Sequence, residues 1–317
     1  MASIIPEGSL AIGIQLPIQS QSRFYVEPWE EGAGSEELAE VCRKADEVGL
    51  FYVAVCDHVA VPRANAERMQ TTWYDTIATL GWIAGLTKSV RLLSHVFVVP
   101  YRHPLQTAKA FATLDELSAG RAILGVGAGH VEGEFDLLGV DFGNRGALTD
   151  EAIDAIRIAL DDEWPEFHGE TWNADGESGL RPRPRQEHLP IWIGGSSKPA
   201  LRRAATRGDG WLPQGTPRDK MPADIQYLRE HRADAGLGEE PIDIGTIAEP
   251  FYVGEPDWDV GSYATTGPAD KITASLLDFH AMGVNHVQVR FRNRSLSELL
   301  DQLDAFKEEV MPHLPNP

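Results

Sequence analysis

Short apolar runs alternate with longer amphipathic segments along the whole chain of 317 residues, and this alternation constrains the fold more than any other feature. The apolar runs predict eight strands. They lie at residues 10–17, 51–58, 91–99, 121–129, 190–195, 209–214, 242–251 and 286–291. Most positions in these runs are apolar without strict alternation, which is typical of a parallel sheet covered on both faces.

A helix is predicted after each strand. The helices lie at residues 35–48, 72–86, 104–117, 148–160, 198–206, 217–235, 268–282 and 295–310. Ser35 stands at an N-cap position and Gly49 at a helix end, as helix termini prefer. Eight strand–helix units predict a (β/α)₈ TIM barrel. The alternative is an open doubly wound sheet, which normally has fewer strands and a phosphate-binding loop after the first one.

No linker or shift of composition divides the chain, so we expect a single domain over residues 1–317. Three longer connections are predicted as insertions in the barrel. Residues 18–34 follow strand one, residues 164–188 follow helix four, and residues 249–267 follow strand seven. The polar connection after strand one lacks the glycine-rich loop of a doubly wound sheet, which favours the barrel.

The charge balance excludes several classes of protein. The chain has 48 acidic and 28 basic residues and a net charge of −20, whereas binding to nucleic acid or to an anionic membrane requires a basic surface. The first residues lack a secretory signal pattern, and the longest charge-free apolar stretch, residues 76–87, is too short to span a bilayer. We therefore expect a cytoplasmic protein with a small-molecule substrate. The spacing of Cys42 and Cys56 predicts two reduced thiols.

In a TIM barrel, functional groups lie at the carboxyl ends of the strands. Three histidines occupy such positions: His58 after strand two, His95 in strand three and His130 after strand four. Each of them alone is as often structural as functional. With Asp57 they include the residue types of a metal site, but strand one lacks the H-x-H of metal-hydrolase barrels, so we expect no metal. The chain also lacks the G-x-S-x-G motif of serine hydrolases.

A turn of small residues joins the fifth predicted strand to the fifth helix. It consists of Gly194, Gly195, Ser196 and Ser197. Glycine lets the backbone approach a ligand closely, and the free N–H groups of a helix start attract an anion. The two hydroxyls and the charge of Lys198 add to this, so we expect phosphate binding here. The alternative is an ordinary helix start in which Ser197 is the N-cap residue.

The loop at residues 125–129 has glycine at every second position, like part of a dinucleotide-binding fingerprint. His130 stands where that fingerprint has its third glycine, so the motif fails as a Rossmann signature. We therefore interpret residues 125–129 as a loop whose backbone lies against a flat ring or a phosphate. Glu132 and Glu134 follow, and we expect both on a solvated face.

A string of motifs runs in order from about residue 50 to residue 213. It comprises residues 80–93, PYRHP at 100–104, TLDELSAGR at 113–121, LGVGAG at 124–129, EF at 134–135, Arg145, PIWIGG at 190–195 and AATRGDGW at 204–211. Together they resemble the bacterial luciferase-like superfamily, most closely its branch that uses the deazaflavin coenzyme F420. The resemblance implies a TIM barrel that binds a flavin or deazaflavin at its carboxyl-terminal mouth and carries out two-electron chemistry.

The resemblance also implies roles by position. Asp57 and His58 correspond to residues beside the cofactor ring, and His95 and Val96 correspond to residues packed behind it. Related barrels have a non-proline cis peptide in strand three, which predicts a cis bond between His95 and Val96.

The remaining cofactor contacts implied by the resemblance follow strands four and five. The glycine loop maps to Gly127 and Gly129, and the phosphate-bearing tail maps to the turn at residues 194–197. Sugar-phosphate dehydrogenases of the family have a glutamate where this chain has His130, which argues against that substrate and leaves the proton donor open.

These features predict an F420-dependent oxidoreductase that transfers a hydride between C5 of the deazaflavin and a small organic substrate. His58 is the first candidate for proton transfer, because histidine titrates near neutral pH, and His95 and His130 are the further candidates. One alternative is an FMN-dependent monooxygenase of the same fold. A second is a non-catalytic flavin-binding barrel. Family members are often dimers, so we expect a homodimer.

Overall fold

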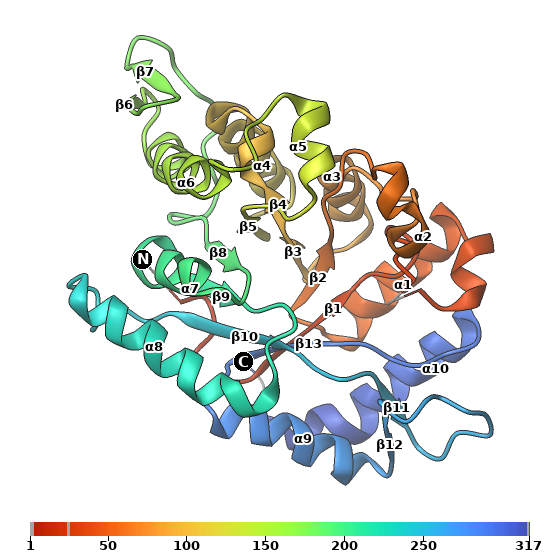
Figure 1. The fold of residues 1–317 in the computed structure, drawn as a ribbon. Coiled ribbons are helices and arrows are strands. Elements are labelled where there is room, and N and C mark those ends of the chain that lie inside the picture. The colour runs from red at the N-terminus through yellow and green to blue at the C-terminus, as the bar shows by residue number, and fades with distance from the viewer. Residues whose placement is uncertain (1–2, 24–25, 316) are drawn as a thin grey trace.

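The computed structural model describes residues 3–23, 26–315 and 317. Eight parallel strands pair all the way round, from β1 through β13 to β10 on one side and through β2 and β3 to β5 on the other (Figure 1). They are β1 (Ala11–Gln15), β2 (Tyr52–Val55), β3 (Arg91–Ser94), β5 (Ala122–Gly127), β8 (Ile191–Gly194), β9 (Gly210–Leu212), β10 (Asp243–Ile247) and β13 (His286–Val289). The closed parallel sheet confirms the predicted TIM barrel.

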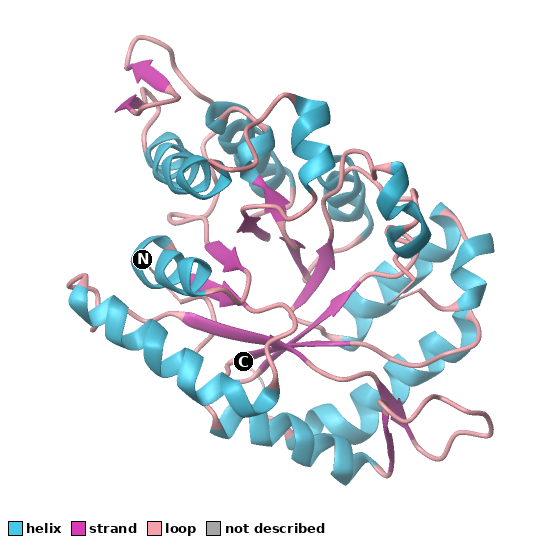
Figure 2. Cartoon of the chain, in the orientation of Figure 1, coloured by secondary structure: helices cyan, strands magenta, loops and turns pink. Residues whose placement is uncertain are grey.

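Helices surround this barrel (Figure 2). The eight that follow the strands are α1 (Ser35–Val48), α3 (Thr76–Leu86), α4 (Pro104–Leu117), α6 (Arg145–Asp161), α7 (Lys198–Arg207), α8 (Met221–Asp234), α9 (Ala269–Ala281) and α10 (Leu296–Ala305). The second of these, α3, begins at Thr76 rather than at Thr72, because the side chain of Asp75 accepts a hydrogen bond from the N–H of Ala78 and caps the helix there. The last gives way to a π-helical turn at Phe306–Val310.

Strand three is interrupted, although the sequence predicts one continuous strand over residues 91–99. After β3 comes the short β4 (Phe97–Val98), and both pair with β5, with Leu92 opposite Ala122 and Phe97 opposite Val126. The peptide bond between His95 and Val96 in the gap is cis, as expected. The gap lies at the carboxyl-terminal rim of the barrel.

The predicted insertions contain short elements of their own. They are the 3₁₀ turn Pro28–Gly32, the antiparallel pair β6 (Glu166–His168) and β7 (Asn173–Asp175), and the parallel pair β11 (Phe251–Val253) and β12 (Thr265–Gly267). Two short helices were not predicted: α2 (Ala66–Met69) and α5 (Glu132–Leu138). Further 3₁₀ turns lie at Arg63–Asn65, Val99–Tyr101, Arg218–Lys220 and Met311–His313.

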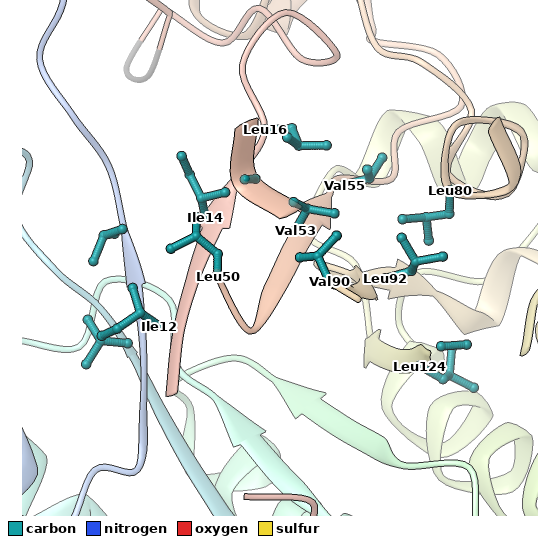
Figure 3. Packing of buried hydrophobic residues seen from close by; sticks show 14 of the residues in the cluster. Ile12, Ile14, Leu16, Leu50, Val53, Val55, Leu80, Val90, Leu92 and Leu124 are labelled. Carbon is teal, nitrogen blue, oxygen red and sulfur yellow. The ribbon is translucent and has the colours of Figure 1, made fainter. Parts of the chain in front are cut away.

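The main core lies between the strands and the helices. Alternate residues of the strands face outward into it and are almost wholly buried, as Figure 3 shows for Ile12, Ile14, Leu16, Val53, Val55, Leu92 and Leu124. Leu80 of α3 packs against this layer. Full burial of such a side chain stabilises the fold by about 1.5–3 kcal/mol.

Three of the rings inside the barrel, those of Tyr52, Trp192 and His286, face glycines. A Cβ atom on Gly13 would lie 2.2 Å from the Tyr52 ring, and one on Gly210 would lie 2.3 Å from the Trp192 ring. Trp192 in turn stacks on His286, with ring centroids 4.2 Å apart. Large rings and glycines on neighbouring strands therefore complement each other, which explains why glycine occurs within these strands.

Among the described residues, no helix is long and apolar enough to cross a membrane.

Replacing Gly210 by alanine tests this packing. The added methyl would meet the buried Trp192 ring, and overpacking a dense core costs about 1–3 kcal/mol. We expect Gly210→Ala to lower the free energy of unfolding by that amount in urea denaturation. Gly81→Ala is the matched control, because its Cβ enters open space on α3 and alanine is favoured in helices by about 0.5–1 kcal/mol. Equal effects of the two substitutions would contradict the packing.

Candidate active site

The carboxyl ends of the strands bring most of the predicted site residues to one rim. Asp57 and His58 follow β2, and His95 and Val96 separate β3 from β4. His130 and the glycines before it follow β5, and residues 194–197 lead from β8 into α7. In the closed sheet, β2 and β8 are separated by β3 and β5. The residues after β2, Asp57 and His58, therefore lie across the mouth from the turn at residues 194–197 that follows β8.

Asp57 is buried, and both of its carboxylate oxygens are occupied by the protein. Oδ2 accepts hydrogen bonds from Arg102 Nη1 at 2.7 Å and from the N–H of Val98 at 2.8 Å. Oδ1 accepts from Arg102 Nη2 at 2.9 Å and from the Thr76 hydroxyl at 3.2 Å. The bidentate pair with Arg102 fixes the segment after β3. Arg102, which sequence reasoning missed, lies in the PYRHP motif.

His58 forms a close pair with Glu134. Its Nδ1 lies 2.6 Å from Glu134 Oε2, and the other carboxylate oxygen accepts from the N–H groups of Val59 at 2.8 Å and Ala60 at 3.1 Å. The Glu134 side chain is fully buried. The expectation that Glu134 lies on a solvated face is therefore wrong, because α5 turns this residue inward, while Glu132 stays exposed.

The charge of Glu134 follows from these partners. Burial alone would raise its pKa, but hydrogen bonds from His58, Ala60 and Val59 outweigh burial, and the pKa of Glu134 lies below its usual range. Burial and the nearby Glu134 both raise the pKa of Tyr101. At neutral pH the site therefore contains a carboxylate beside an imidazole, with a neutral phenol nearby.

Two further rings surround His58. Trp73 meets it edge-on with ring centroids 4.3 Å apart, and His130 lies 5.7 Å away. Partial burial, together with the nearby His58 and Arg68, lowers the pKa of His130. The indole N–H of Trp73 is buried and has no hydrogen-bond partner among the described residues. The sequence predicts the second helix from Thr72, which would include Trp73, whereas the structure places Trp73 in the loop before α3.

His95 lies deeper than the other two histidines. Burial lowers the pKa of its imidazole to about 4, despite the neighbouring Gln288, so His95 is neutral near pH 7. Its Nδ1 is buried without a partner in the part of the chain that the structure describes. A neutral imidazole at this depth is suited to donate or accept one hydrogen bond to a group above it.

Val96 explains two of the predicted cofactor-binding glycines. A Cβ on Gly127 would lie 2.4 Å from Val96 Cγ2, and one on Gly194 would lie 2.4 Å from Val96 Cγ1. Gly129 has φ of +77°, and a Cβ there would lie 2.8 Å from Phe135. Their direct contact with a cofactor stays a prediction, since packing within the protein already requires glycine at these positions.

The turn at residues 194–197 is held firmly by its neighbours. Gly195 has φ of +110° and donates its N–H to Leu212 O at 3.0 Å. The Ser196 hydroxyl donates to Gln214 O at 2.9 Å, and Ser197 Oγ accepts from the N–H of Ala200 at 3.4 Å. Ser197 is thus the N-cap of α7, and both hydroxyls are engaged within the protein.

The backbone of this turn offers the donors that the side chains do not. Among the described residues, no acceptor is recorded for the N–H groups of Ser196, Ser197 and Lys198. Pro199 follows and has no N–H, while the Lys198 ammonium lies 3.2 Å from Asp224. Three backbone donors at the start of a ten-residue helix fit one phosphate group.

No group of three or more histidine, cysteine or acidic side chains is arranged for a metal within residues 3–23, 26–315 and 317.

The closed barrel and the groups at its rim define an enzyme of the TIM-barrel class. A family model described as luciferase-like monooxygenase matches residues 12–271, so the chain belongs to the luciferase-like family and is an oxidoreductase. It is 32% identical over 186 residues to the F420-dependent glucose-6-phosphate dehydrogenase of Amycolatopsis mediterranei, a match covering 57% of this chain and 54% of the relative.

Two solved structures share the fold. The monooxygenase RslO1 from Streptomyces bottropensis matches with a TM-score of 0.78 at 20% identity, covering 96% of this chain and 99% of that one. An F420-dependent secondary alcohol dehydrogenase, in complex with an F420-acetone adduct, matches with a TM-score of 0.77 at 19% identity, covering the same shares of the two chains.

The low pKa of Glu134 predicts how the free energy of unfolding depends on pH. Because its pKa is lower in the folded than in the unfolded chain, its contribution is fully present above the unfolded value of about 4.3 and is lost as pH falls through the folded value. We expect Glu134→Gln to lower the free energy of unfolding by about 1.5–3 kcal/mol near pH 7. Urea denaturation should show this difference from the wild type shrinking toward pH ~3. A difference that does not depend on pH would contradict the assigned charge.

Proposed function

We propose that the protein is an F420-dependent oxidoreductase that transfers a hydride between C5 of the deazaflavin and a small organic substrate. One observation supports this proposal: an imidazole paired with a carboxylate, and three backbone N–H groups with no recorded acceptor among the described residues, lie at strand ends on one rim of the barrel. The imidazole suits proton transfer, which accompanies hydride transfer to or from polar substrates. The N–H groups suit the phosphate of a cofactor tail.

The residues at the mouth fit such a cofactor. The N–H groups of residues 196–198 would hold its phosphate. The buried atoms Trp73 Nε1 and His95 Nδ1, which have no partner in the described part of the chain, would serve as hydrogen-bonding groups near its ring. When bound, the cofactor supplies the two-electron chemistry. The protein orients it, excludes water with the packed Val96, and provides His58 to hold or move a proton.

An FMN-dependent monooxygenase is the second candidate. Backbone N–H groups recognise the phosphate of either cofactor, so the turn at residues 196–198 favours neither. The family contains both kinds of enzyme, and 4-hydroxyprotoasukamycin monooxygenase of Streptomyces nodosus subsp. asukaensis is 30% identical over 158 residues, 47% of this chain and 43% of that protein.

Titration with purified cofactors separates the two candidates. We expect micromolar binding of F420 and much weaker binding of FMN, measured by cofactor fluorescence. A deazaflavin that lacks the phosphate tail should bind about tenfold or more weakly than F420, because a charge-assisted contact is worth about 1.5–3 kcal/mol. Binding of FMN without binding of F420 would overturn the proposal. Tight binding of F420 without its reduction or oxidation by any substrate of a broad panel would favour a non-catalytic barrel.

Substitution of His58 tests its part in turnover. We expect His58→Ala to lower kcat by about 10²–10⁴-fold, the usual contribution of a general acid or base. The dissociation constant of F420 should change by less than about tenfold, or 1.4 kcal/mol. His168→Ala, in the exposed β6–β7 hairpin, is the control and should change neither value. Equal losses in kcat and in affinity would reduce His58 to a binding residue.

A further inference from the structure

We propose that Glu134 is a positioning residue: it holds His58 in the tautomer with the proton on Nδ1 and so leaves Nε2 as the atom that accepts the substrate proton. This inference deepens the proposed function and rests on it for the identity of the reaction. Its structural part, the tautomer, stands on the contacts of Glu134 alone.

The first argument is the hydrogen-bond inventory of the pair. A carboxylate can only accept, so the proton between His58 Nδ1 and Glu134 Oε2, 2.6 Å apart, belongs to the nitrogen. The low pKa of Glu134 keeps it ionised at neutral pH. A neutral imidazole has one N–H, which places the lone pair on Nε2.

The second argument is that the carboxylate cannot turn away. Its Oε1 accepts from two consecutive backbone N–H groups, those of Val59 and Ala60, directly after His58 in the chain. Both oxygens are therefore directed at the same turn. The histidine and the backbone that carries it are fixed to one buried group, as in sites where a third group orients a catalytic base.

The third argument concerns what is left for Nε2. Trp73 packs against the ring of His58, and no hydrogen-bond partner of Nε2 is recorded among the described residues. In the oxidative direction, the X–H bond of the substrate would break as an N–H bond forms at Nε2. The neighbouring C–H bond would break as C=X forms, and its hydride would be taken up by the oxidised deazaflavin, the two-electron acceptor of the proposed function. The resulting imidazolium lies beside the negative charge of Glu134. In the reductive direction the same proton returns to the substrate.

A glutamine at position 134 should reverse the tautomer. Its single oxygen is needed by the N–H groups of Val59 and Ala60, which turns the amide NH₂ toward His58 Nδ1. That nitrogen must then accept, and the proton moves to Nε2. The protonated Nε2 no longer takes a proton from the substrate, the same defect that a wrong tautomer causes when the aspartate of a serine-protease triad becomes asparagine.

The tautomer is measured on the cofactor-free protein by two-bond ¹H–¹⁵N NMR of the histidine rings, with the His58 signals assigned from their absence in His58→Gln. We expect a protonated Nδ1 in the wild type and a protonated Nε2 in Glu134→Gln. Glu132→Gln, a matched change at the exposed residue of the same helix, should leave the wild-type pattern. A wild type with the proton on Nε2, or a Glu134→Gln variant with the wild-type pattern, would overturn the proposal.

Turnover with F420 provides the second measurement. We expect Glu134→Gln to lose about 10³–10⁴-fold in kcat, with Glu132→Gln within about twofold of the wild type. Glu134→Asp, which keeps an acceptor-only carboxylate, should retain the wild-type tautomer and recover part of the loss. A Glu134→Gln variant that is folded, has the inverted tautomer and keeps wild-type turnover would contradict the catalytic part. If F420 does not bind at all, the proposed function fails, but the NMR result still decides the tautomer.

Discussion

The carboxylate of Asp57 joins separate parts of the barrel rim. It follows β2 and binds the N–H of Val98 in β4, the guanidinium of Arg102 before α4 and the hydroxyl of Thr76 at the start of α3. Removing one partner of such a buried ion pair typically costs about 3–5 kcal/mol. These contacts fix the backbone at Asp57 and so position the neighbouring His58. The candidate site therefore depends on Asp57, although both carboxylate oxygens of Asp57 are used within the protein and neither is left for a ligand.

Two carboxylates near the mouth differ because of their surroundings. Asp57 pairs with the guanidinium of Arg102 and stabilises the fold. Glu134 contacts an imidazole and two backbone N–H groups and positions His58 in the candidate site. Their order along the chain suggests the opposite, since Asp57 stands beside His58 and Glu134 is 76 residues away from it. Burial and partners, rather than proximity in sequence, determine which acid acts on the histidine.

The pattern of the sequence predicts the barrel well, because buried parallel strands and amphipathic helices have distinct periods. It predicts less where an element is too short to show a period. The seven residues of α5 are too few to show a helical period, so the sequence does not indicate that Glu134 is turned inward. The helix predicted from Thr72 in fact starts four residues later at Thr76, so Trp73 lies in the preceding loop, where its ring packs against His58.

The glycines illustrate a second limit. Spacing alone suggests a backbone near a ligand at Gly127 and Gly194, but the side chain that requires them is Val96, which comes from another strand. Contacts between residues this far apart in the chain have no local signature. By contrast, the resemblance to the luciferase-like family predicts the cis peptide bond between His95 and Val96, which no local sequence pattern would indicate.

The most direct measurement of the central claim is a crystal structure of the complex with F420. The account predicts the cofactor phosphate within hydrogen-bonding distance of the N–H groups of residues 196–198 and the deazaflavin ring over Val96, with Nε2 of His58 facing the space beside C5. A phosphate bound elsewhere, or a ring that leaves His58 out of reach of its reactive face, would contradict it.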